Sequence, residues 1–148
     1  QKATEMGAGI IQPVITRYVN NQKVNLDKLK ANAIEAAEQC EVLSVPRVEP
    51  AMSFARLVET WEQDQGDRVL VFCDEEAASA SPVDTLAGLE GKRIGLIIGP
   101  EGGFAPEERE LLLAQSFVVP ISLGPRILRA DTAAVAAMAL IQAIAGDW

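Results

Sequence analysis

Two short segments of this chain carry residue types that could do chemistry. We call GPEGGF (residues 99–104) the glycine loop and LGPRILRADT (residues 123–132) the arginine loop. Glycines let a backbone turn tightly and approach a ligand closely, while guanidinium groups offer a fixed fork of donors to phosphates and planar carbonyls. Because the chain has no histidine, a histidine base and the usual zinc sites are excluded.

The glycine loop favours a neutral or cationic ligand over a phosphate. It lacks the Lys-Ser/Thr pair of a Walker A loop and does not follow the G-x-G-x-x-G pattern. Glu101, and Glu107 and Glu108 just beyond it, oppose an anion at the start of the next helix. S-adenosylmethionine, with its sulfonium and amino groups, is a ligand of the favoured kind. A plain strand-to-helix turn is the other interpretation of these glycines.

The arginine loop places two cations and an acid between a strand pattern and an apolar helical pattern. The cations are Arg126 and Arg129. The apolar residues between them, Ile127 and Leu128, predict a loop with one buried face and one presented face. Asp131 is either an acid that caps the helix start or a carboxylate that takes part in catalysis. Solvated surface arginines are the alternative to a binding role.

Alternating strand and helix patterns must position these loops. Strand patterns cover 10–15, 68–74, 93–99 and 117–123, and helical patterns cover 26–39, 53–62, a segment from Pro106, and a last segment to about residue 145. Strands that are apolar throughout, alternating with helices, predict an α/β fold with a parallel sheet and flanking helices. Ligands bind such sheets beyond the carboxyl ends of the strands, where both loops lie.

Local signals mark several element ends. Ser53 is suited to an N-cap, Pro106 to a first helical turn and Gly7 to the stop of an opening helix. NNQ (residues 20–22) predicts a turn, and the acidic, Ser/Ala-rich residues 75–88 predict an exposed connection.

Composition narrows the class of protein. The 148 residues fit one domain, and 49% apolar residues can form a core. The net charge of −8 argues against a free-standing nucleic-acid binder. Residues 1–47 nevertheless hold six Lys/Arg against five Asp/Glu, so Arg17 and Lys23 are candidate contacts to RNA phosphates.

Other features bear on location. The two cysteines form neither a disulfide framework nor a metal set, which favours a reducing, cytoplasmic setting. No apolar run approaches the roughly 20 residues that cross a membrane. The chain begins with Gln1, in what reads as a helix already under way, so we expect that a preceding segment is missing.

Four motifs together resemble a known family. They are KATEMG (2–7), EAAEQC (35–40), LIIGPEGGFAPEE (96–108) and LGPRILRADTA (123–133). In this order, and over nearly the whole chain, they resemble the bacterial 16S ribosomal RNA (uracil-N3) methyltransferases, the RsmE family of the SPOUT superfamily. Two residues depart from the family pattern: Met6 replaces a leucine and Asp131 replaces a glutamate.

The resemblance implies a fold, a cofactor and partners. The fold would be a parallel α/β sheet with a C-terminal trefoil knot, with residues 1–148 as one SPOUT domain and the family's N-terminal PUA-like RNA-binding domain absent. The cofactor would be S-adenosyl-L-methionine without a metal. The partners would be 16S rRNA of the small ribosomal subunit and a second copy in a homodimer. The implied donor site comprises Leu96, Ile98, Gly99, Pro100, Glu101, Gly102 and Gly103, with Leu123, Gly124, Arg126, Ile127, Leu128 and Arg129.

Methylation of uracil N3 requires that the N3 proton be removed or that the resulting anion be stabilised. We expect Arg129 or Arg126 to stabilise the anion at the uracil carbonyls, and Asp131 or Glu101 to accept the proton. Three other functions are compatible with the sequence. They are a knotted methyltransferase of another RNA such as tRNA, a donor-binding dimerisation domain that is inactive without its RNA-binding domain, and a general nucleotide-binding domain.

Overall fold

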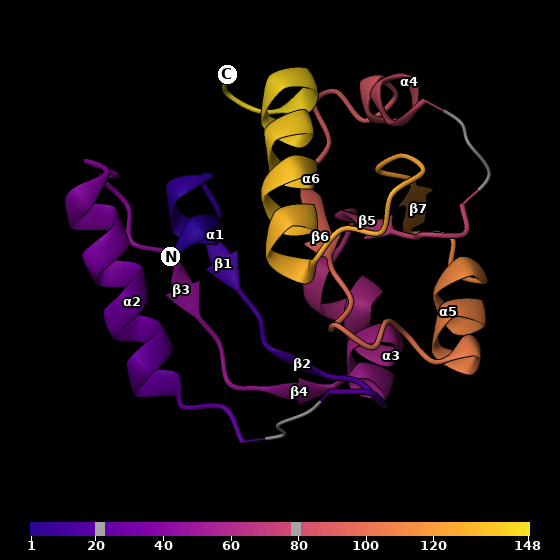
Figure 1. The fold of residues 1–148 in the computed structure, drawn as a ribbon, viewed down its shortest axis with the longest axis horizontal. Helices are drawn as coiled ribbons and strands as arrows, with labels where there is room; N and C mark the ends of the chain where they lie inside the picture. The colour runs from indigo at the N-terminus through magenta and orange to yellow at the C-terminus, as the bar shows by residue number, and fades with distance from the viewer. Residues whose placement is uncertain (20–22, 78–80) are drawn as a thin grey trace.

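A three-stranded parallel sheet forms the centre of the larger lobe of the molecule (Figure 1). The computed structural model describes residues 1–19, 23–77 and 81–148. The strands are β5 (Val69–Cys73), β6 (Ile94–Ile97) and β7 (Val118–Ile121), in the order β6-β5-β7. Val71 of β5 lies opposite Leu96 on one side and Val119 on the other. The predicted strands 68–74, 93–99 and 117–123 are therefore confirmed, each one or more residues shorter at its ends.

Two pairs of short strands form separate two-stranded sheets, which are also parallel. They are β1 (Ile10–Ile11) with β3 (Arg47–Val48), and β2 (Val14–Ile15) with β4 (Met52–Ser53). The sequence pattern predicted one strand over 10–15, whereas the structure has two. Pro13 lies between them, and it has no N–H to donate to a ladder.

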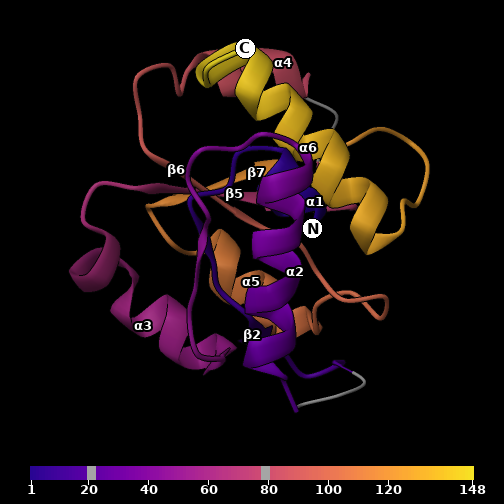
Figure 2. The ribbon, with the colours of Figure 1, turned by 90° about the vertical axis from the view of Figure 1, so that its left-hand side faces the viewer.

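Six helices complete the described part of the chain. They are α1 (Lys2–Glu5), α2 (Leu26–Gln39), α3 (Phe54–Gln65), α4 (Pro82–Ala87), α5 (Pro106–Leu113) and α6 (Ala130–Ala145). α2 lies along one side of the molecule, next to α1 and β3 (Figure 1 and Figure 2). No helix in the described ranges is long and apolar enough to cross a membrane.

The predicted helix ends are confirmed by their geometry. The hydroxyl of Ser53 accepts a hydrogen bond from the backbone N–H of Arg56 at 3.2 Å, which caps α3. Pro106 is the first residue of α5, where its missing N–H costs nothing. Gly7 follows α1 with a φ of +85°, a conformation that glycine adopts without strain. The turn predicted for 20–22 lies outside the described residues.

The prediction of an exposed connection over 75–88 holds for most of its described residues, but it missed a short helix with one buried side chain. Ser81 caps α4 and Pro82 begins it, and Leu86 on this helix is completely buried. Leu86 packs with Val71 and Ile121 of the sheet. A single leucine in an acidic, Ser/Ala-rich segment therefore anchors a short helix, because the sheet offers it an apolar surface.

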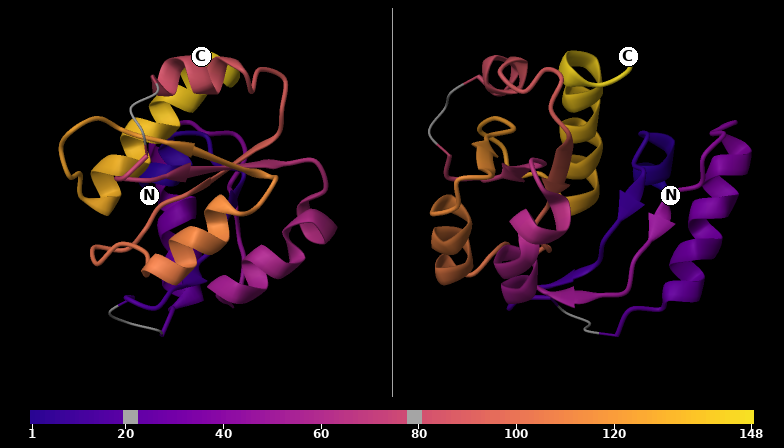
Figure 3. Two further views of the ribbon diagram at one scale, coloured as in Figure 1. Left: turned by 90° about the vertical axis from the view of Figure 1, so that its right-hand side faces the viewer. Right: turned by 180° about the vertical axis from the view of Figure 1, so that it is seen from behind.

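Helices cover both faces of the sheet, as predicted (Figure 3). Residues of β5 alternate between the faces: Leu70 and Phe72 pack under α3 and α5, and Val71 packs under α4. α6 covers the same face as α4, through Leu140, Ile141 and Ile144. The layered arrangement leaves the carboxyl edge of the strands to the connecting loops.

Gly95 in β6 is required by the close approach of Trp61. A Cβ on Gly95 would lie 2.8 Å from Cη2 of Trp61. Trp61 has little freedom to move, because its indole N–H donates to the Arg68 carbonyl at 2.9 Å and its ring stacks on Phe117. We expect Gly95→Ala to lower the free energy of unfolding in urea by about 1–3 kcal/mol through overpacking. Gly9→Ala is the matched control, since a Cβ there meets no atom within 4 Å. Equal unfolding midpoints for the two variants would contradict the steric argument.

Candidate functional site

The strand order places the glycine loop and the arginine loop on either side of the carboxyl end of β5 (Figure 1). The glycine loop follows β6, the arginine loop follows β7, and Asp74 follows β5 between them. The backbone N–H of Asp74 donates to the Ile121 carbonyl at 3.0 Å, which extends the pairing to this edge. Leu96 and Leu123 pack against one apolar cluster. Both halves of the predicted donor site therefore start from one edge of the sheet.

A tight turn shapes the glycine loop. The backbone N–H of Gly103 donates to the Pro100 carbonyl at 2.8 Å, and Gly103 has a φ of +68°. The intervening residues, Glu101 and Gly102, are exposed. The turn therefore presents a carboxylate and bare backbone to the outside.

Phe104 fixes the glycine loop to the core. Its ring lies 5.9 Å from the ring of Phe54 and 5.3 Å from the ring of Phe72, between centroids. A Cβ on Gly99 would lie 3.1 Å from the Phe104 ring, so this glycine allows the ring to fold back under the loop. The loop is thus held from below by an aromatic cluster.

Glu108 holds the end of the glycine loop to the segment that follows β2. One carboxylate oxygen accepts the backbone N–H of Ala105 at 3.0 Å, and the other accepts that of Arg17 at 2.9 Å. The guanidinium of Arg17 lies 3.4 Å from the Glu107 carboxylate, in an exposed pair. The Glu108 carboxylate thus already accepts two backbone hydrogen bonds. Arg17, predicted to contact RNA phosphates, is exposed on the surface. Lys23, the other predicted phosphate contact, is also exposed.

The arginine loop is more exposed than its sequence predicted. Gly124 turns the chain with a φ of +100°, and Arg126 is exposed. Leu128 is half-buried, but Ile127 is 84% exposed, so the predicted burial of Ile127 is wrong. No apolar surface of the described chain reaches it at this edge. Arg129 is the N-cap residue of α6, and 85% of its side chain is exposed.

Asp131 lies in the first turn of α6. Its carboxylate accepts the backbone N–H of Thr132 at 2.9 Å and lies 3.9 Å from Nε of Arg129. This geometry fits an acid at a helix start. Because 75% of the side chain is exposed, the carboxylate is also accessible to a ligand.

Sequence reasoning missed an ion pair between the end of β5 and α5. Arg109 donates to both carboxylate oxygens of Asp74 at 2.9 Å, and the Asp74 side chain is only 4% exposed. This hydrogen bonding raises the pKa of the Arg109 guanidinium, so Arg109 stays charged. The pair joins the edge of the sheet to the helix that leaves the glycine loop. An acid directly after a buried strand was the available signal.

Cys73, next to Asp74, is not a nucleophile. Burial raises the pKa of its thiol to about 12. The thiol is therefore protonated at neutral pH, whereas the thiolate is the reactive form. The candidate reactive groups at this edge are therefore the carboxylates and arginines.

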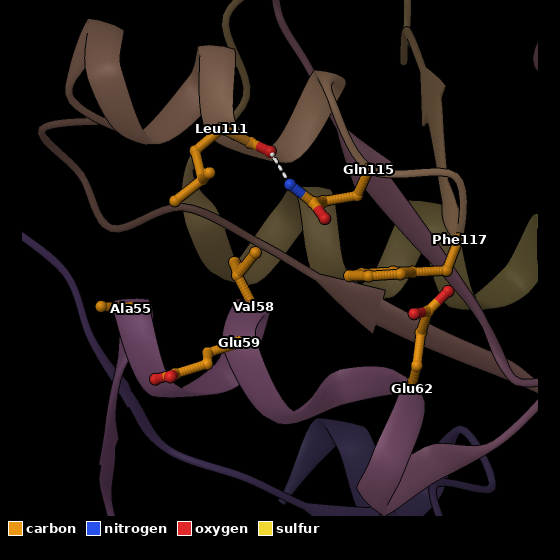
Figure 4. A pocket seen from close by; sticks show the side chains of 7 residues that line it. All are labelled: Ala55, Val58, Glu59, Glu62, Leu111, Gln115 and Phe117. Carbon is orange, nitrogen blue, oxygen red and sulfur yellow. Dashed lines mark hydrogen bonds between the residues drawn. The ribbon is translucent and has the colours of Figure 1, made fainter.

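A pocket elsewhere is separate from the two loops. It lies between α3 and α5, with Val58, Leu111 and Phe117 as its apolar lining and Glu59 and Glu62 at its side (Figure 4). None of the predicted donor-site residues lines it.

Comparison with known proteins gives a family and several relatives. The family model of the RNA methyltransferase domain matches residues 1–142. The chain is 36% identical over 140 residues to a ribosomal RNA small subunit methyltransferase E from Rickettsia conorii. The aligned region covers 95% of this chain and 56% of that protein. The chain is also 34% identical over 155 residues to the protein of the same name from Bacillus subtilis, covering 95% of this chain and 58% of that protein. The chain thus spans a little over half the length of these relatives.

Two solved structures share the fold. A putative methyltransferase from Legionella pneumophila in complex with the bound cofactor SAM superposes with a TM-score of 0.78 at 32% identity, over 97% of this chain and 58% of that one. The ribosomal RNA small subunit methyltransferase E from Neisseria gonorrhoeae, bound to S-adenosyl methionine, superposes with a TM-score of 0.77 at 28% identity, over 99% of this chain and 60% of that one. With the family match across residues 1–142, these likenesses show that the chain belongs to the RNA methyltransferase domain family, among relatives named ribosomal RNA small subunit methyltransferase E.

Proposed function

We propose that this chain is the donor-binding and catalytic part of an enzyme that methylates N3 of a uridine in 16S rRNA of the small ribosomal subunit. The observation that carries the proposal is the meeting of the glycine loop and the arginine loop at one sheet edge. Relatives solved with S-adenosyl methionine have the same fold, and the named relatives act on small-subunit ribosomal RNA.

The residues at this edge fit S-adenosylmethionine. Leu96 and Leu123 are half-buried apolar residues that could take the flat adenine, and the turn at Gly102 leaves backbone groups accessible. The exposed carboxylate of Glu101 complements a cationic ligand. The remaining proposed donor contacts come from Ile98, Gly99, Pro100 and Gly103, and from Gly124, Ile127 and Leu128.

The proposed chemistry is a proton transfer coupled to an in-line displacement. When bound, S-adenosylmethionine supplies a methyl group already activated by its sulfonium. Asp131 or Glu101 accepts the N3 proton of uracil, and both carboxylates are exposed. Arg129 or Arg126 donates hydrogen bonds to the uracil carbonyls and stabilises the anion. A bond then forms between N3 and the methyl carbon while the carbon–sulfur bond breaks, which leaves 3-methyluridine and S-adenosylhomocysteine.

The proposal includes a homodimer, a trefoil knot in the C-terminal segment and a cytoplasmic setting. α6 supports a further contact surface, because Ala137 is its only residue buried in the described chain although the helix is mostly apolar. The exposure of Ile127 beside it adds to this surface.

Donor binding and product identity test the proposal separately. We expect titration calorimetry to detect binding of S-adenosylmethionine and S-adenosylhomocysteine to the chain. We expect small ribosomal subunits incubated with chain and donor to gain 3-methyluridine, identified by mass spectrometry of nucleosides. Absence of donor binding would remove the proposal entirely. Donor binding without turnover would restrict the proposed role of the chain to donor binding. Methylation of a tRNA would contradict the proposal that 16S rRNA is the substrate.

A further inference from the structure

An exposed tyrosine lies against the glycine loop. A Cβ placed on Gly102 would be 3.1 Å from Cβ of Tyr18 and 3.6 Å from its carbonyl oxygen, so the two residues are in close contact. The segment that carries Tyr18 is held in place, because the backbone N–H of Arg17 donates to Glu108 at 2.9 Å. The position of Tyr18 at the rim of the loop is thus built into the fold.

The ring of Tyr18 makes no aromatic or hydrogen-bonding contact with the described residues. The residue is 44% exposed, and it is the only tyrosine of the chain. Across residues 1–19, 23–77 and 81–148, its ring contacts no other aromatic ring and its hydroxyl makes no hydrogen bond. Tyrosines that stay partly exposed in this way are typical of contact surfaces, where one face is apolar and the hydroxyl is wet.

The surroundings of the ring suit a flat ligand. Gly102 and Gly103 have no side chains, and a Cβ on Gly103 would meet no atom within 4 Å, so the loop beside the ring is open. Arg17 is adjacent, and its pairing with Glu107 at 3.4 Å is exposed on both sides, which makes the pair weak. An aromatic face with a cation beside it is the arrangement that binds unpaired nucleotides, by stacking on the base and attracting the phosphate.

We propose that Tyr18 stacks on a base of the RNA substrate at the rim of the glycine loop. The inference rests on the proposed function, because it assumes that RNA reaches the methyl-donor edge. Tyr18 would hold a base of unpaired RNA beside the donor, and Arg17 would lie near its phosphate.

A substitution series tests the ring itself. Tyr18→Ala is expected to weaken binding of a uridine-rich single-stranded RNA oligonucleotide roughly 5- to 150-fold, measured by fluorescence anisotropy at one fixed salt concentration. Tyr18→Phe keeps the aromatic face and is expected to retain affinity within about twofold. Neither change alters the net charge, so the salt-dependent phosphate attraction cancels in the comparison.

Controls separate stacking from other effects. Trp148→Ala removes another exposed aromatic, 67% exposed at the C-terminus, and should leave RNA affinity unchanged. Donor affinity by calorimetry and the thermal midpoint should be unchanged in all three variants, because the Tyr18 ring is not part of the core.

Several results would overturn this inference. One is that Tyr18→Ala binds RNA as tightly as wild type, and another is that Tyr18→Phe loses as much RNA affinity as Tyr18→Ala. A third is that wild type shows no measurable RNA affinity. A fourth is that the variants lose only donor affinity, which would place the donor's adenine on the ring. A different result, the absence of donor binding by wild type, would contradict the proposed function. The two failures are therefore distinguishable.

Discussion

Replacing Arg129 by alanine is expected to lower the rate of methylation about 100- to 1,000-fold, the usual loss when one donor to a developing anion is removed. The Arg129 side chain is 85% exposed, and its guanidinium meets only Asp131, at 3.9 Å, among the described residues. It is therefore available to a uracil carbonyl. Because the backbone at this position is retained, the change in donor affinity should be much smaller than the change in rate.

Three further variants, one of them a control, separate the possible explanations of this result. Arg129→Lys keeps the charge but not the fork of donors, so an intermediate rate is expected. Arg126→Ala decides which arginine carries the larger effect. Arg56→Ala, at an exposed position on α3, removes the same charge away from the loops and serves as the control. If Arg129→Ala and Arg126→Ala both bind donor and methylate like wild type, the assignment of the arginines is wrong.

Replacing Asp74 by alanine is expected to cost about 3 kcal/mol of unfolding free energy, measured in urea. The substitution leaves the Arg109 guanidinium without the carboxylate that takes both of its hydrogen bonds. Arg109 keeps 28% exposure and the exposed Glu76 carboxylate at 3.4 Å, which offset part of the loss. The lower end of the range for buried pairs therefore applies.

The control for Asp74 is a surface pair of the same chemistry. Asp67 and Arg93 are also joined at 2.9 Å, but their side chains are 80% and 59% exposed. Asp67→Ala should leave the unfolding midpoint nearly unchanged, because water screens such pairs. Asp74→Asn, which keeps the shape and one acceptor, should lie between the two. An Asp74→Ala midpoint equal to that of Asp67→Ala would show that burial of the pair contributes nothing.

Helices with strong local signals were predictable from sequence. The apolar period over 26–39 matches α2 residue for residue, with Ala33, Ala36 and Ala37 buried. The cap at Ser53 and the proline at 106 located the starts of α3 and α5. These signals suffice because a cap or a period acts within one or two helical turns.

Elements that depend on a distant surface were not predictable. The short helix α4 is stable because Leu86 finds an apolar site on β5 and β7, and its own composition resembles a loop. Ile127 shows the converse, since an apolar residue stays exposed when no neighbour of the described chain covers it. In both cases burial is a property of the site that surrounds the residue.

The sequence by itself determined the alternation of strands and helices, the flexible backbone of the glycine loop and the charges of the arginine loop. Only the tertiary structure decided that β5 lies between β6 and β7, that Asp74 pairs with Arg109, and that Tyr18 lies on Gly102. Hydrogen bonds and caps within an element join near neighbours, so the local sequence contains them. The order of strands and the contacts at their edge join residues that are far apart in the sequence, and packing of the whole chain selects them. The bond from Arg109 to Asp74, for example, spans 35 positions.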